Sequence, residues 1–279
     1  MSFLDALDAA RQRNNSLLCI GLDPLPQRIP QILGDDVPAA VVAFNRAIIA
    51  ATSDLVCAYK PNTAFYEALG PRGWWALAET VRAVPLDVPV IVDGKRGDIG
   101  STAEQYASAL FDELGAGACT VSPYMGEDSV APFTREGRFA FVLCHTSNPG
   151  AAEFQELKVT HEGHMMPLYE AVARRVARWP AATQCGLVVG ATYPETLARV
   201  AAAAPTLPLL IPGLGTQGGD LEAVLAALVG RRVVVNVARQ VTYASTEGSD
   251  FAEAARRAAE SWRDRLNGAG AVADVVGER

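Results

Sequence analysis

Three lysines stand out in a chain whose positive charge comes almost entirely from arginine. Lysine and arginine together number 24, and lysine occupies only positions 60, 95 and 158. A lysine retained against such a bias favours a task that arginine cannot perform, because an ammonium group can give up a proton near neutral pH. Lys60 and Lys95 each end an apolar run, LVCAYKP and VPVIVDGK. These two are therefore candidates for proton transfer.

Carboxylates accompany the second of these lysines. Asp93 lies two residues before Lys95, and Asp98 lies three residues after it, in the segment IVDGKRGDIG. Residues two apart in a strand share a face, so Asp93 and Lys95 are expected to enter the same pocket. Neighbouring carboxylates keep an ammonium charged in a partly desolvated site. Such an array can stabilise developing negative charge and then deliver a proton, although a purely structural ion pair is the alternative.

Eight short apolar runs must position these residues. They are enriched in β-branched or aromatic residues and nearly continuous, as in strands buried on both faces, and they span 17–23, 55–61, 88–95, 118–123, 139–146, 185–192, 207–213 and 232–238. Helical patterns lie between them, near 38–53, 72–84, 101–115, 127–136, 164–179, 194–203, 220–229 and 249–267. This alternation predicts a single-domain α/β fold, a (β/α)₈ TIM barrel over residues 1–267. Residues 268–279 are expected to form a loose tail.

Three local features refine this prediction. Ser101 and Glu104 have the spacing of a capping box at a helix start. No GxGxxG follows the first strand, which disfavours an open dinucleotide-binding sheet. The segment 147–165 is long for a loop between strand and helix, and long loops are often functional.

A barrel of this kind places its active site at the carboxyl ends of the strands. The polar and glycine residues at those ends, in chain order, are Asp23, Lys60, Asp93, Lys95, Ser122, Thr146, Thr192, Gly213, Gly215 and Arg239. Two lysines and two aspartates converging there are costly to bury unless they pair. The glycine-rich segment GLGTQGGD follows the seventh strand and Arg239 follows the eighth, which is where many barrels bind phosphate.

The bulk composition narrows the class of protein. A formal net charge of −7 argues against a general binder of nucleic acid or membrane surfaces, and no stretch is apolar enough to span a membrane. The N-terminus has early acidic residues and no signal-peptide pattern. The five cysteines are scattered within apolar runs, which is typical of reduced core residues and not of disulfides or a zinc site. We expect a cytoplasmic protein.

Taken in order, the motifs resemble those of the orotidine 5′-monophosphate decarboxylase family. The matching segments are D-x-K-x-x-D at 93–98, IGLDP at 20–24, AYKPN at 58–62, VSPYMG at 121–126, PGLGTQGGD at 212–220 and VARQV at 237–241. KPNTAFYEALG (60–70) and CHTSNPGA (144–151) resemble the longer bacterial branch, type 2. The resemblance covers nearly the whole barrel.

The resemblance implies cofactor-free and metal-free decarboxylation of orotidine 5′-monophosphate to UMP and CO₂, the final step of de novo pyrimidine biosynthesis. Lys95 would protonate C6 of the pyrimidine, and Asp93 would lie against the substrate carboxylate. Lys60 would hold Asp93 and a ribose hydroxyl, and Asp23 would bind ribose as well. Asp98 completes the alternating charge array.

The remaining roles implied by the resemblance concern the partner subunit, the phosphate and the base. Asp98 and Thr102 would reach into the active site of a second copy, in a homodimer. Arg239 and Gln217 would grip the 5′-phosphate, together with the backbone of Gly213 and Gly215. Ser147 matches the hydroxyl that recognises the base only loosely, because this loop departs from the shorter branch.

Three rival functions remain open at this point. Sister enzymes that decarboxylate keto-gulonate phosphate or synthesise hexulose phosphate use magnesium, and Lys60 occupies a position where their metal site needs an acid. A non-catalytic nucleotide-binding barrel would tolerate loss of Lys95. A phosphosugar isomerase would need a glutamate base that the sixth and eighth strand ends lack. His145, His161 and His164 form no metal-binding motif.

Overall fold

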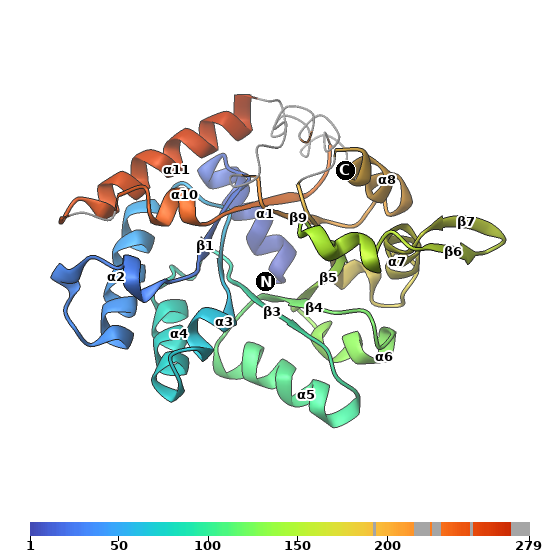
Figure 1. Cartoon of the computed structure of the whole chain (residues 1–279), viewed down its shortest axis with the longest axis horizontal. Helices are drawn as coiled ribbons and strands as arrows, with labels where there is room; N and C mark the ends of the chain where they lie inside the picture. The colour runs from blue at the N-terminus through green and yellow to red at the C-terminus, as the bar shows by residue number, and fades with distance from the viewer. Residues whose placement is uncertain (192–193, 215–223, 225–229, 246–247, 269–279) are drawn as a thin grey trace.

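Eight parallel strands form the centre of the molecule and close into a barrel (Figure 1). They are β1 (Leu18–Leu22), β2 (Ala58–Pro61), β3 (Ile91–Arg96), β4 (Ala118–Val121), β5 (Phe139–His145), β8 (Cys185–Val189), β9 (Leu209–Pro212) and β10 (Val233–Val237). Their spatial order is β2-β1-β10-β9-β8-β5-β4-β3, and parallel bridges Tyr59–Val90 and Asn62–Asp93 join its two ends. The computed structural model describes residues 1–191, 194–214, 224, 230–245 and 248–268. The predicted (β/α)₈ barrel is confirmed.

The strands are buried on both faces, as their apolar sequences predict. Every residue of β1, β8 and β10 is buried. At the amino-terminal end the barrel is closed by a helix to which the sequence analysis assigned no element, α1 (Phe3–Asn14). The ring of Phe3 lies 5.2 Å from that of Phe139 and 5.9 Å from that of Phe141. This end of the barrel is therefore a packed apolar core, and the opposite end is left for chemistry.

Helices surround the strands, as Figure 1 shows. They are α2 (Val37–Thr52), α3 (Thr63–Glu67), α4 (Pro71–Ala83), α5 (Gly100–Ser108), α6 (Glu127–Val130), α7 (Leu168–Val176), α8 (Pro194–Ala203), α10 (Arg239–Thr242) and α11 (Phe251–Gly268). A π-helical turn over Ala109–Glu113 continues α5, and 3₁₀ turns span Pro26–Arg28, Gln31–Leu33, Ala131–Phe133, Pro149–Glu153 and Ala182–Gln184. The five cysteines are free and buried, as predicted.

The segment predicted as a long loop, 147–165, contains a β-hairpin that the sequence analysis missed. Its strands are β6 (Lys158–His161) and β7 (His164–Pro167), which pair antiparallel and project beside α7 in Figure 1. Glu162 and Gly163 form the turn, both with positive φ, as tight hairpins require. Glutamate is uncommon at such a position, so the turn was not recognised. The predicted helix 164–179 consequently begins only at Leu168.

The predicted capping box at Ser101 is also wrong. The helix begins at Gly100, its N-cap is Ile99, and no side chain caps it. Ser101 is exposed inside the first turn, because the chain already enters the helix before it. The predicted helix 220–229 lies outside the described residues apart from residue 224, and so does the tail beyond residue 268.

Candidate active site

The carboxyl end of β3 departs from regular strand geometry. Ile91 and Val92 pair in register with β4, but pairing resumes only at Arg96. Between these two points β3 uses four residues where β4 uses two. Lys95 has a φ of +44°, in the left-handed region. That conformation costs a non-glycine residue about 1–2 kcal/mol. Strain at such a position is typical of residues held for function.

Asp93 accepts hydrogen bonds from both sides of its carboxylate. Lys60 Nζ lies 2.7 Å from Oδ2, and Lys95 Nζ lies 2.8 Å from Oδ1. The hydroxyl of Thr120 on β4 also donates to Oδ1, at 2.8 Å. The expected contact between Asp93 and Lys95 is therefore confirmed, although a bulge and not a regular strand brings them together.

Exposure differs sharply within this group. The side chains of Lys60 and Asp93 are 4% and 10% exposed, whereas that of Lys95 is 43% exposed. Burial alone would raise the pKa of Asp93, but the two ammonium groups outweigh it and hold that pKa well below its usual range. Burial opposes the charge of Lys60, yet Asp93 and Asp23 raise its pKa. The buried pair fixes charge, and Lys95 presents its ammonium to the open side.

Asn62 links this charge array to Asp23. Its backbone N–H donates to Asp23 Oδ1 at 3.2 Å, and its side-chain amide lies 3.5 Å from Asp93 Oδ2. Burial raises the pKa of Asp23, and the positive charge of Lys60 offsets only part of that effect. Asp23 therefore takes up a proton more readily than Asp93.

A cavity of about 420 Å³ opens beside Asp23, within the size range of small-molecule sites. Its walls come from the ends of β1, β9 and β10 and from α3, and are formed by Asp23, Leu25, Phe65, Gly213, Asn236, Val237, Ala238, Arg239 and Gln240. The structure thus places three predicted residues, Asp23, Gly213 and Arg239, around one hollow. Arg239 is exposed at its edge.

Ser147 lies in the turn after β5, against the ends of two further strands. A Cβ added to Gly190 would lie 2.8 Å from the backbone nitrogen of Ser147 and 2.9 Å from its Cβ. One added to Gly213 would lie 3.5 Å from the Ser147 hydroxyl. The expected base-recognising hydroxyl and the expected phosphate-binding glycine are therefore neighbours.

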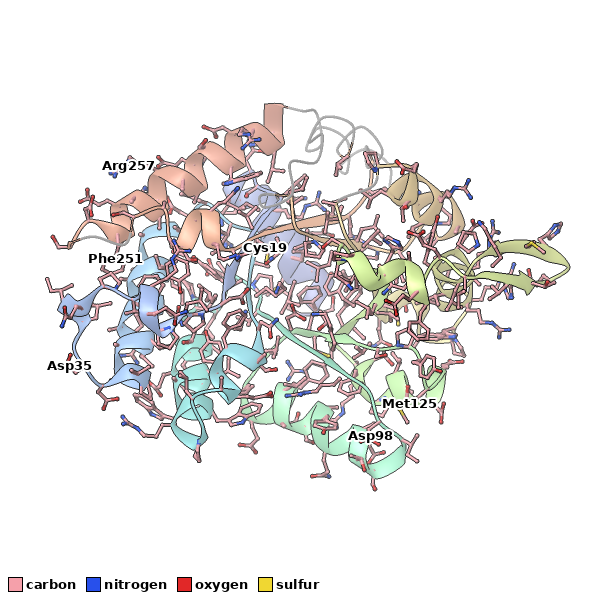
Figure 2. All side chains as sticks on the ribbon, viewed as in Figure 1. Cys19, Asp35, Asp98, Met125, Phe251 and Arg257 are labelled. Carbon is pink, nitrogen blue, oxygen red and sulfur yellow. The ribbon has the colours of Figure 1, made fainter. Side chains whose placement is uncertain are left out.

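Asp98 and Thr102 do not join the array within this chain. In the described part of the chain Lys95 pairs with Asp93, and the carboxylate of Asp98 accepts the backbone N–H of Ile99 at 2.8 Å. Thr102 is exposed on α5. Figure 2 shows Asp98 at the rim of the molecule, apart from Cys19 in the barrel. Gly215 and Gln217 lie outside the described residues.

Sequence reasoning missed three polar residues at this site. Thr120 and Asn62 hydrogen-bond Asp93, and Asn236 lines the cavity and accepts the Cys19 thiol at 3.7 Å. Asn236 is a polar residue inside the apolar run RVVVNVA, which is a signal that could have identified it. Thr120 has no such signal, because threonine is ordinary in a strand.

The described residues contain neither a metal centre nor a membrane-spanning helix. No group of three or more His, Cys, Asp or Glu side chains in that part of the chain is arranged to hold a metal ion. None of the helices there is both long and apolar enough to cross a membrane.

Known proteins resemble this chain over nearly its whole length. The family model described as orotidine 5′-phosphate decarboxylase / HUMPS family matches residues 16–257. The orotidine 5′-phosphate decarboxylase of Herpetosiphon aurantiacus is 55% identical over 262 residues, covering 93% of this chain and 96% of that protein. That of Roseiflexus castenholzii is 51% identical over 275 residues, covering 96% and 98%.

Solved structures agree. Leishmania donovani OMP decarboxylase superposes with a TM-score of 0.83 at 42% identity, covering 96% of this chain and 98% of that one. Leishmania donovani UMP synthase gives 0.85 at 44% identity, with 96% of this chain matched to 56% of that longer protein. Because the family model, the sequences of these relatives and their barrels all match over most of its length, the chain belongs to the orotidine 5′-phosphate decarboxylase / HUMPS family.

Proposed function

We propose that this protein decarboxylates orotidine 5′-monophosphate to UMP and CO₂, the last step of pyrimidine biosynthesis, without a cofactor. The observation that supports this most directly is the Lys60–Asp93–Lys95 array, in which a buried ion pair orients a second, accessible ammonium. A cavity of about 420 Å³ is lined in part by Asp23, whose carboxylate accepts the backbone N–H of Asn62. We take orotidine 5′-monophosphate as the substrate because the relatives carry the name orotidine 5′-phosphate decarboxylase.

Loss of CO₂ from C6 of orotate leaves a carbanion in the plane of the ring, which the π system cannot delocalise. The protein must then stabilise that charge with groups already in place. Lys95 supplies a positive charge at the open side of the array and protonates C6. Asp93, anchored by Lys60, faces the departing carboxylate and holds the Lys95 ammonium in place through a hydrogen bond.

The rest of the nucleotide occupies the cavity in this proposal. Asp23 accepts a ribose hydroxyl, and Ser147 recognises the base beside Gly213. Arg239, at the cavity edge, binds the 5′-phosphate together with the backbone of Gly213 and Gly215 and the side chain of Gln217. Binding energy from such remote groups can be used to lower the barrier at C6.

We also propose that the enzyme is a homodimer in which Asp98 and Thr102 complete the partner's site. Ile99, next to Asp98 in the chain, is 59% exposed, and Tyr124 and Met125, which closely follow the Gly97 neighbour Ser122, are 90% and 45% exposed. Large apolar side chains exposed on neighbouring segments favour a protein interface there. The five buried, free cysteines support a reducing compartment, and we propose the cytoplasm.

The direct test follows decarboxylation of orotidine 5′-monophosphate by ultraviolet absorbance in the presence of EDTA, for the natural chain and Lys95→Ala. We expect turnover that survives EDTA and falls about 10³-fold in the variant, because general acid catalysis contributes on that scale. A folded natural chain without turnover would refute the proposal. Magnesium-dependent turnover of a sugar phosphate would instead assign the protein to the other branch of its family.

A further inference from the structure

Thr120 lies opposite the irregular part of β3. The register of β3 and β4 shifts by two residues between Val92 and Arg96, and Thr120 is the residue of β4 that faces this stretch. It is 1% exposed. Backbone groups in such a bulge cannot use the ordinary ladder and need other partners.

The Thr120 hydroxyl supplies those partners. Its oxygen accepts the backbone N–H of Gly94 at 3.1 Å and that of Lys95 at 2.9 Å. A hydroxyl has two acceptor lone pairs and one proton. With both lone pairs engaged, its proton is directed to Asp93 Oδ1, 2.8 Å away. The hydrogen-bonding capacity of the group is then fully used.

These three bonds meet where Lys95 is held in its unusual conformation. The bond to the Lys95 N–H holds the backbone at its left-handed φ, and the bond to Asp93 fixes the same carboxylate oxygen that Lys95 Nζ contacts. The Thr120 hydroxyl thus fixes both the backbone that carries the Lys95 side chain and the carboxylate that the Lys95 ammonium contacts.

We propose that Thr120 is a positioning residue, which sets the location and direction of the Lys95 ammonium through the backbone of Lys95 and the carboxylate of Asp93. The inference rests on the proposed function, in which Lys95 protonates C6. Thr120 is buried behind Asp93 and binds the array, not the substrate. Its loss should therefore lower kcat and leave nucleotide affinity nearly unchanged.

The test compares Thr120→Val, which keeps the shape and removes the hydroxyl, with Thr120→Ser, which keeps the hydroxyl. For Thr120→Val we expect kcat to fall roughly 10- to 100-fold, the effect of displacing a catalytic group by about 1 Å. KM and the Kd for UMP should change less than about threefold, since the phosphate and ribose contacts remain. Thr120→Ser should recover most of kcat.

Thr80→Val is the matched control. Thr80 is also fully buried, and its hydroxyl accepts a hydrogen bond from Asn45 at 3.0 Å, but it lies on α4. It should lose stability without losing kcat. If Thr120→Val does not fold, Thr120→Cys replaces the hydroxyl with a thiol of similar size that forms weak hydrogen bonds, and the same split between kcat and KM is expected.

Two results would overturn the proposal. One is a folded Thr120→Val or Thr120→Cys protein with the natural kcat. The other is a serine variant as slow as the valine variant, which would assign the effect to packing of the methyl group. Failure of the proposed function is distinguishable, because the natural chain itself would then not decarboxylate the substrate.

Discussion

At the scale of single residues, the charge state of the site depends on Asp93. Its pKa is lowered and that of Lys60 is raised, so both remain charged through the neutral range. A carboxylate with a lowered folded pKa contributes stability above its unfolded pKa of about 4, and loses it as pH falls through the folded value. A lysine with a raised pKa contributes below about 10.4 and loses that contribution at higher pH. The pair is therefore fully stabilising from mildly acidic to mildly alkaline pH.

Lys95→Arg separates the charge of this residue from its proton. A guanidinium retains the positive charge beside Asp93 but does not release a proton near neutral pH, so kcat should fall about 10³-fold. The Kd for UMP, measured by calorimetry, should stay within a few-fold. Lys158→Arg on the exposed β6 strand is the control and should keep the natural kcat. An arginine variant with more than about a tenth of the natural rate would contradict Lys95 as the donor.

The raised pKa of Asp23 predicts that pH affects substrate binding, measured as KM, and not the chemical step, measured as kcat. Because its pKa is raised and that of Asp93 is lowered, acidification protonates Asp23 first. A protonated Asp23 accepts a ribose hydroxyl poorly, so KM should rise on the acid side while kcat stays level. The measurement is kcat and KM against pH for the natural chain and Asp23→Asn. In Asp23→Asn, any pH dependence of KM that remains comes from titration of the substrate phosphate. The rise in KM that Asp23 causes at acid pH should be absent from this variant. A kcat that falls in step with the rise in KM would argue against this assignment.

At the scale of elements, the strands were predictable and their irregularities were not. Nearly continuous apolar runs identified all eight barrel strands, and charged residues at their ends identified Lys60, Asp93 and Lys95. The roles of Thr120 and Asn62 depend on a register shift and on a contact across the closing seam of the barrel. Both are tertiary features that local sequence patterns do not contain. The β6–β7 hairpin was missed because its turn uses glutamate.

Gly190, at the end of β8, lets the turn that contains Ser147 approach closely. A Cβ there would lie 2.9 Å from the Ser147 Cβ, which real structures essentially never show, so Gly190→Ala must displace that turn. If Ser147 recognises the base, KM should rise about tenfold, which corresponds to about 1.4 kcal/mol of binding. Steady-state kinetics and UMP binding measure this.

Gly150→Ala serves as the control for that variant. It lies in the same segment, but an added Cβ would come no closer than 3.4 Å to any atom, the Asn148 amide nitrogen. Its KM should stay close to the natural value. A Gly190→Ala protein that binds UMP normally would show that the Ser147 turn takes no part in recognition.

At the scale of the whole molecule, the described part of one chain does not bring all four predicted charged residues together. Lys60, Asp93 and Lys95 gather at the barrel mouth, whereas Asp98 lies at the rim, where its carboxylate accepts the backbone N–H of Ile99. The spacing D-x-K-x-x-D does not reveal this separation, because β3 ends at Arg96, inside the motif, and Asp98 already lies in the connection that leads to α5. A second copy that covers this surface would bury the apolar groups and bring its Asp98 toward the first copy's array.

Mixing two inactive variants tests whether the site is shared between subunits. Lys95→Ala and Asp98→Ala should each be nearly inactive alone. In a mixed dimer, one site combines Lys95 from the second variant with Asp98 from the first and is intact. Random exchange of subunits should therefore restore about a quarter of the natural activity, since half of the dimers are mixed and each has one intact site. Size-exclusion chromatography before and after mixing confirms that dimers form and exchange. If Asp98 acts within its own chain, every site in the mixture lacks one group, and exchanged dimers that stay inactive would rule out a shared site.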